Sequence, residues 1–190
     1  MEEPMLTELT GQGWMQILSQ SFTTPAELPF VLSKRSLSVE KLVRLAQTSA
    51  CDDEPYGRKI LFKSPEIEVM LAKWSYQASA SPHNHGFSKG LIWFVQGDFS
   101  ERHFIFSEGE LKSSGEPVQF KEGSVAQVVS NDIHSCCPVK DGVSLHIYSP
   151  AIQKMKVWDL KNRETLTVAD ECGAWIPKDL KLIANRVKWN

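Results

Sequence analysis

The sequence predicts a mainly β protein: an antiparallel β-barrel with a helical N-terminal part packed on it. Two observations support this prediction. Residues 1–50 carry apolar side chains at helical spacing, whereas from Tyr56 onward short β-type runs alternate with turn residues. The chain has 190 residues, the length of one domain with its own core. We therefore predict a single domain over 1–190, with helices in 1–50 and the barrel core in 56–168.

Two helix starts are visible in the N-terminal part. The run Thr24-Pro25-Ala26-Glu27 has the pattern of an N-cap, a first-turn proline and a capping-box acid. Ser38 precedes a second amphipathic segment, whose apolar residues are Val39, Leu42, Val43 and Ala46. We expect these helices to pack on the barrel.

Five runs have the composition and alternation of strands: 67–74, 91–96, 99–106, 125–129 and 143–148. Turn signals separate them, namely Gly97-Asp98, Glu108-Gly109, Glu122-Gly123 and Asp141-Gly142, and the last predicts a tight hairpin. Residues 154–168 predict a final hairpin, and 179–189 a helix or tail. Many short antiparallel strands indicate a sandwich or barrel, and a small barrel encloses room for one small ligand.

Charge and cysteine usage exclude several classes of partner. The net charge of -2 comes without a basic stripe, which argues against nucleic acid as a partner. The N-terminus has neither a basic start nor an apolar run, so we expect no signal peptide and no membrane span. The four cysteines lack a C-x-x-C spacing and are expected to be reduced. We expect a cytoplasmic monomer.

Three histidines carry the functional prediction. His83 and His85 leave the same face of an extended segment, because successive strand side chains alternate. A His-x-His pair alone can be an accident of composition. His134, however, follows on a second predicted strand in a chain of only five histidines, at the separation expected when a later strand returns beside an earlier one. We predict that the three imidazoles bind one metal ion.

The strand at 143–148 carries a polar row. Ser144, His146 and Tyr148 share one face, and the apolar residues between them occupy the other. A half-exposed edge strand would explain this alternation. If the row points inward, each polar group needs a partner, and a hydrogen-bonded relay would present the phenol to the metal cavity.

Arg58 and Tyr56 precede the predicted strands. A guanidinium at a barrel mouth offers a planar fork for a substrate carboxylate, and Tyr56 shares its face if the segment is extended. The alternative is a solvated surface arginine. His103, beside Glu101, is expected to be a surface or paired histidine rather than a ligand. A zinc site at Cys136 and Cys137 is disfavoured because no second paired spacing exists.

Together these motifs resemble the cysteine dioxygenase family of the cupin superfamily over residues 56–168. The resemblance rests on Tyr56-Gly57-Arg58, Trp74, His83-Asn84-His85, Val95-Gln96-Gly97, Asp132-Ile133-His134 and the segment from Ser144 to Pro150. It implies a cupin-type jelly-roll barrel in which His83, His85 and His134 hold Fe(II). It further implies that Arg58 binds the substrate carboxylate, that Tyr56 lines the pocket and that Trp74 packs near the iron. Tyr148, His146 and Ser144 would form the catalytic relay, and the Ser149-Pro150 bond would be cis.

The implied reaction is the oxidation of L-cysteine by dioxygen to cysteine sulfinate. Gly90 stands where mammalian members have a cysteine cross-linked to the tyrosine, so Tyr148 should be a plain phenol, as in bacterial members. Met155 replaces another cysteine, and Ala151 a second proline. Residues 88–90 offer no carboxylate ligand, which leaves three imidazoles as donors.

Three classes of function remain open, the first being a thiol dioxygenase. Arg58 favours cysteine as substrate, but another small thiol acid such as 3-mercaptopropionate is an alternative. The chain could also be a three-histidine metal cupin that is not an oxygenase, or a cupin without enzymatic activity.

Overall fold

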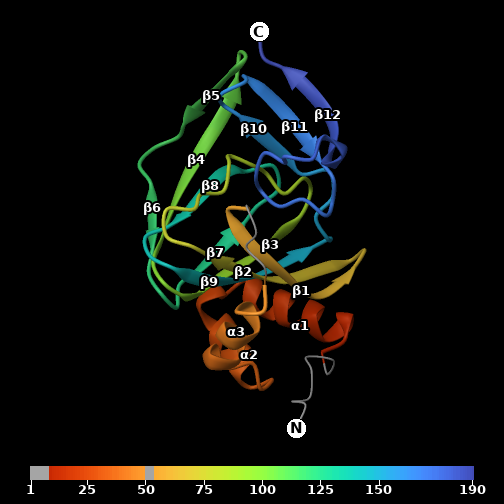
Figure 1. Ribbon diagram of the computed structural model, residues 1–190. Coiled ribbons are helices and arrows are strands. Elements are labelled where there is room, and N and C mark those ends of the chain that lie inside the picture. The colour runs from red at the N-terminus through yellow and green to blue at the C-terminus, as the bar shows by residue number, and fades with distance from the viewer. Residues whose placement is uncertain (1–8, 50–53) are drawn as a thin grey trace.

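The computed structural model describes residues 9–49 and 54–190 and places the helices against one layer of strands (Figure 1). The helical part contains α1 (Gly11–Phe22), the 3₁₀ turn η1 (Pro25–Glu27), α2 (Leu28–Ser33) and α3 (Val39–Ala46). Ser38 caps α3 as predicted, because its hydroxyl accepts from the Lys41 amide. Thr24 does not act as the predicted side-chain cap: the Glu27 amide bonds the Thr24 carbonyl and closes only η1.

The first sheet has the order β1-β2-β9-β3-β7, and its strands are antiparallel. Their bounds are β1 (Tyr56–Ser64), β2 (Ile67–Trp74), β3 (Lys89–Gln96), β7 (Val125–Val128) and β9 (Gly142–Ser149). The helices cover one face, where side chains such as Leu71, Leu145 and Ile147 join a core with Trp14 and Leu42. The opposite face of this sheet looks into the barrel.

The second layer is built in two parts. β4 (Phe99–Ser107) pairs with β5 (Glu110–Ser113), β6 (Val118–Phe120) and β8 (Ile133–Pro138). The other part has the order β10-β11-β12, with β10 (Lys156–Asp159), β11 (Glu164–Val168) and β12 (Ile183–Lys188). His83 joins the parts, because it forms isolated bridges with His134 of β8 and Val157 of β10. The His-x-His segment therefore completes the second layer.

These layers enclose an interior core that includes Ile92, Phe94, Phe99 and Val157. The fold is mainly β, a cupin-type antiparallel barrel of jelly-roll topology with N-terminal helices on one face, which confirms the predicted fold class. The hairpin predicted at 154–168 is also confirmed, as β10 and β11 pair. Within the described ranges, no helix has the length and apolar character needed to cross a bilayer.

Two further local predictions were wrong. Asp141 and Gly142 do not form a hairpin, because β8 pairs with β4 whereas β9 pairs with β2 and β3. The connection crosses between layers, and a Cβ at Gly142 would lie only 2.7 Å from the Gln96 carbonyl oxygen. Residues 179–189 contain η2 (Leu180–Leu182) and β12 rather than a helix or tail. Most of β12 is exposed, so pairing with β11, not a buried apolar face, makes it a strand.

Candidate metal centre

The three predicted histidines meet inside the barrel. Each offers one ligand atom, and these atoms lie within 4.8 Å of one another, on side chains that are all buried. His83 stands at an isolated bridge rather than in the expected strand, but the bridge itself aligns two of the ligands. The His83 amide donates to the His134 carbonyl at 2.9 Å, and the His134 amide returns a bond of 3.0 Å.

The environment of each ring leaves nitrogens available to a metal. His83 Nδ1 is 2.8 Å from the Ser81 carbonyl oxygen, and His134 Nδ1 is 3.0 Å from Glu101 Oε2. His134 Nε2 and His85 Nδ1 are buried and have no hydrogen-bond partner within residues 9–49 and 54–190. Such unpaired buried nitrogens are costly, and a metal ion would satisfy them. The donor set therefore fits a divalent transition metal that accepts imidazole ligands.

Burial also keeps these rings in the form that binds metal. Desolvation lowers the pKa of His83 well below its usual value of 6.5, and the neighbouring His134 lowers it further. The pKa of His85 is lowered in the same way, first by burial and then by His83 and His134. Both rings are neutral at physiological pH, as metal ligation requires.

The polar row of β9 faces the cavity and is hydrogen-bonded along its length. Ser144 Oγ lies 2.7 Å from His146 Nε2, and His146 Nδ1 lies 2.8 Å from the Tyr148 hydroxyl. That hydroxyl is 3.2 Å from His85 Nε2, and Trp74 Nε1 donates to Ser144 Oγ at 2.8 Å. β9 is the central strand of its sheet, so the alternative of a half-exposed edge strand does not apply.

Trp74 sets the direction of this chain of bonds. An indole N–H can only donate, so Ser144 is free to donate its own proton to His146 Nε2. A neutral His146 then carries its proton on Nδ1 and donates to the Tyr148 oxygen. The Tyr148 proton is left to donate toward a molecule in the cavity, because a neutral His85 that offers Nδ1 to a metal carries its own proton on Nε2, the nitrogen 3.2 Å from the phenol oxygen.

Burial lowers the pKa of His146 to about 3, and the charges of His134 and Arg58 add to the effect. The folded chain therefore resists protonation of this ring over a range in which an unfolded histidine takes up a proton. Since the unfolded state binds more protons, the free energy of unfolding falls as the pH drops from about 6.5 toward 3.

We expect the His146→Gln protein to lose the part of this acid sensitivity that comes from the protonation of one histidine. The slope of unfolding free energy against pH should fall by up to about 1.4 kcal/mol per pH unit below pH 6.5. Urea denaturation of both proteins between pH 4 and pH 8 measures the difference, with the values above pH 7 as the internal control. Parallel curves for the two proteins would contradict the assignment.

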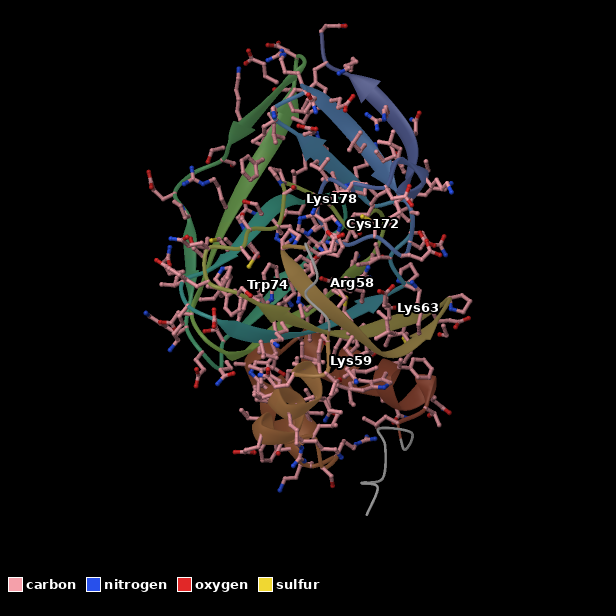
Figure 2. All side chains as sticks on the ribbon, in the orientation of Figure 1. Arg58, Lys59, Lys63, Trp74, Cys172 and Lys178 are labelled. Atoms are coloured by element: carbon pink, nitrogen blue, oxygen red, sulfur yellow. The ribbon has the colours of Figure 1, made fainter. Side chains whose placement is uncertain are left out.

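Arg58 lies on β1, not before the strands, and lines the same cavity as the histidines. Its Nη2 is 3.3 Å from Glu68 Oε1, its Nη1 donates to the Glu171 carbonyl at 2.9 Å, and its Nε contacts Met70 Sδ at 3.5 Å. Figure 2 shows Arg58 and Lys63 along β1, with Cys172 close to Arg58. The alternative of a freely solvated arginine is thereby excluded, because its side chain is only 13% exposed.

The cavity holds about 490 Å³ of empty space, including its opening to solvent. Besides the predicted site residues, its wall is largely apolar and includes Met70, Ile92, Phe94, Ile152 and Met155. Tyr56 lines it as expected, stacked on Trp74 at 4.1 Å between ring centroids. Its hydroxyl accepts from the Ala174 amide at 2.9 Å, and burial raises its pKa to about 12. Tyr56 therefore shapes the wall and remains a phenol.

Gly90 lies directly opposite Tyr148 in the pairing of β3 with β9. A Cβ at this position would overlap the Ile147 carbonyl oxygen and come within 2.7 Å of Tyr148 Cδ1. The chain therefore lacks both a cysteine to link to Tyr148 and the space to hold one.

We expect Gly90→Ala to destabilise the protein by about 1–3 kcal/mol or more, because a fixed backbone oxygen blocks the new methyl group. Gly115→Ala is the control: no atom lies within 4 Å of its Cβ position, so only its positive φ resists the change. Urea denaturation measures both. Equal stability of the two variants would show that the barrel relaxes around residue 90.

Two buried carboxylates were not predicted as part of the site. Glu68 holds Arg58 and, through Oε2, Lys63 at 3.1 Å. Glu101 contacts His134 and also His103, which is paired as expected. The alternation that places Phe99 inside β4 also turns Glu101 inward, and this was the available signal. Burial raises the pKa of Glu101, but bonds and charges from His134 and His103 together lower it below its usual value.

The remaining cysteine and backbone predictions can also be compared with the structure. Cys136, Cys137 and Cys172 are free thiols, and Cys51 lies outside the described residues. The Ser149-Pro150 bond is cis. In the described part of the chain, the three histidines are the group suited to a metal, and Cys136 and Cys137 do not join them.

No family model matches the chain. Solved structures similar to it include an uncharacterised protein with a double-stranded β-helix domain from Klebsiella pneumoniae, at 13% identity and a TM-score of 0.49 over 63% of this chain and 88% of that one. A cupin superfamily protein from Desulfitobacterium hafniense has 16% identity and a TM-score of 0.45 over 55% and 86%. KdgF from Halomonas sp. has 22% identity and a TM-score of 0.40 over 50% and 79%.

At these scores the likeness adds no argument about activity, and the fold assignment rests on the strand topology described above. The chain is thus a cupin-type β-barrel whose buried His83, His85 and His134 form a group that can hold a metal ion.

Proposed function

We propose that the protein is an iron-dependent thiol dioxygenase that converts L-cysteine and O₂ to cysteine sulfinate. One observation carries the proposal: a three-imidazole metal group, a guanidinium and a hydrogen-bonded phenol line one small buried cavity. A thiol amino acid has matching groups, since its sulfur binds metals and its carboxylate suits a guanidinium.

His83, His85 and His134 would hold Fe(II) through neutral imidazole nitrogens. A ferrous ion bound there would supply open coordination positions at which a thiolate and O₂ can be brought together. No carboxylate belongs to the ligand group within the described residues. The uncompensated charge of such a site favours an anionic sulfur ligand, so the substrate thiol would bind deprotonated.

Arg58 would bind the substrate carboxylate. A guanidinium has five N–H donors, and the three observed contacts use one each, which leaves one on Nη1 and one on Nη2. Two N–H groups on different nitrogens are what a bidentate carboxylate contact needs. Glu68, Met70 and the Glu171 carbonyl would fix the plane of the fork before substrate arrives.

Tyr148 would donate a hydrogen bond inside the cavity. Burial raises the pKa of its hydroxyl well above 10, so the phenol keeps its proton. His146 and Ser144 would hold the hydroxyl in place through the directed chain that begins at Trp74. The donated bond would stabilise oxygen near the metal.

The reaction balances without another reductant or oxidant. Both atoms of O₂ end on the substrate sulfur, and the proton released from the thiol on binding accounts for the sulfinate product being an anion. The protein's contribution would be positioning: Arg58 and the metal ligands fix two ends of the substrate, and the apolar wall limits water.

The proposal also gives the expected partners and location. The partners are a small thiol amino acid and O₂, and the enzyme would act in the cytoplasm, where a thiol substrate and the free cysteines of the chain stay reduced.

The test is metal analysis of the purified protein, followed by oxygen uptake and sulfinate measurement with L-cysteine and with 3-mercaptopropionate. We expect about one iron per chain and faster turnover of L-cysteine. Faster turnover of 3-mercaptopropionate would reassign the substrate to another thiol acid. Bound metal without oxygen uptake would indicate a cupin with other chemistry, and absence of metal would indicate a binding module; either result would overturn the proposal.

A further inference from the structure

Glu101 contacts one of the three histidines of the candidate metal centre. It lies on β4, where its side chain is only 5% exposed, and its Oε2 is 3.0 Å from His134 Nδ1. His134 lies on β8, the neighbour of β4, so the contact spans two paired strands (Figure 1). Glu101 Oε2 is buried and makes no hydrogen bond of standard geometry within the described ranges; because a carboxylate can only accept, a proton on His134 Nδ1 is the arrangement that this contact favours.

This contact fixes what the other nitrogen of the ring can do. With the proton on Nδ1, His134 Nε2 has a free lone pair, and this nitrogen is buried without a partner in the described ranges. It is therefore the ligand atom that His134 offers to the cluster. A carboxylate behind a ligating imidazole both orients the ring and makes it more basic.

The three histidines differ in this respect. His83 Nδ1 contacts a backbone carbonyl, that of Ser81, at 2.8 Å. His85 Nε2 contacts the Tyr148 hydroxyl at 3.2 Å. Only the His134 contact in the described part of the chain involves a charged acceptor. The three imidazoles carry no negative charge themselves. Glu101, which contacts His134, supplies a negative charge next to them.

Glu101 is in turn held by a second pair. Its Oε1 is 3.0 Å from His103 Nε2, and His103 Nδ1 is 3.1 Å from Asp132 Oδ2. Both nitrogens of His103 thus face carboxylate oxygens. His103 and Asp132 are each 32% exposed, so a continuous chain of contacts runs from the cavity to the surface.

We propose that Glu101 is a positioning residue of the metal centre, which fixes His134 as the Nδ1–H tautomer and supplies anionic charge behind it, while His103 and Asp132 hold Glu101 in place. This inference rests on the metal centre of the proposed function, but it does not depend on which substrate or reaction the centre serves.

The first test is Co²⁺ titration of the metal-free full chain, followed by visible absorption. Glu101→Gln keeps the shape and an acceptor oxygen but loses the charge, and we expect its Co²⁺ affinity to fall about 10- to 100-fold. His103→Gln should weaken binding in the same direction by a smaller factor. Glu110→Gln is the matched control, because Glu110 pairs with Lys112 on the exposed β4–β5 hairpin; its affinity should equal that of the wild type.

The second test reads the tautomer directly and needs neither metal nor turnover. Nitrogen-15 NMR of the imidazoles in the metal-free protein should show His134 protonated at Nδ1. In Glu101→Leu, which has no acceptor, the Nδ1–H form should no longer dominate. Circular dichroism checks that each variant is folded, and the partly exposed His103 provides a variant for the case in which Glu101 cannot be replaced.

Two results would overturn the inference: an Nε2–H tautomer of His134 in the wild type, or Co²⁺ affinities of Glu101→Gln and His103→Gln equal to that of Glu110→Gln. A wild-type chain that binds no Co²⁺ would overturn its metal part. Normal Co²⁺ binding and the expected tautomer in a protein that consumes no oxygen would support the role of Glu101 and reject the proposed dioxygenase activity alone.

Discussion

His83→Ala is expected to abolish metal binding and oxygen uptake together. The change removes one of three imidazoles and leaves too few donors for a stable site. The main-chain bonds between residues 83 and 134 do not involve the lost side chain, so the second layer of the barrel should still form. Elemental analysis gives metal per chain, and an oxygen electrode with L-cysteine gives turnover.

Ser81→Ala is the matched control for this variant. His83 Nδ1 contacts the carbonyl oxygen of residue 81, and alanine retains that oxygen. Ser81→Ala should therefore keep both the metal and the activity. If His83→Ala held as much metal as this control, the three histidines would not form the metal site; if it lost metal but kept turnover, the reaction would not use the metal.

The second large effect is expected from Arg58→Gln. Hydrogen bonds between charged groups contribute about 1.5–3 kcal/mol each, and the proposal gives the substrate carboxylate two of them. We expect kcat/KM for L-cysteine to fall about 100-fold or more, chiefly through a higher KM. Steady-state oxygen uptake over a range of L-cysteine concentrations measures both constants.

Cysteamine, a thiol amine without a carboxylate, is the substrate control. Its turnover cannot use the two N–H groups of Arg58, so wild type and Arg58→Gln should oxidise it at similar rates. A 100-fold loss on both substrates would mean that Arg58 supports the structure rather than the carboxylate.

A double variant separates the loss of the substrate contact from a loss of protein stability. Arg58→Gln alone leaves Glu68 buried with Lys63 as its remaining partner, which can destabilise the barrel. Arg58→Gln combined with Glu68→Gln removes that charge. If the double variant regains stability but not affinity for L-cysteine, the carboxylate contact is supported. Recovery of KM in the double variant would contradict it.

Much of the site was predictable because it obeys local rules. Alternation along β9 places Ser144, His146 and Tyr148 on one face, and the structure shows them bonded in a row. The three histidines could be grouped because two of them are two residues apart and one lies on a later strand. The failures at the 141–142 connection and at 179–189 have a common cause: in both cases a strand partner outside the local pattern decided the conformation. Thr24 failed for a local reason, because the Glu27 amide bonds the Thr24 carbonyl rather than its hydroxyl.

The sequence by itself determined the class of the fold, the grouping of the three histidines and the shared face of Ser144, His146 and Tyr148, because periodicity and residue chemistry are local properties of the chain. Only the tertiary structure decided which charges stand behind those side chains. Glu101 reaches His134 across paired strands, and Glu68 reaches Arg58 across β1 and β2. Such contacts depend on strand register and layer order, which arise when distant segments pack together and which no short window of sequence contains.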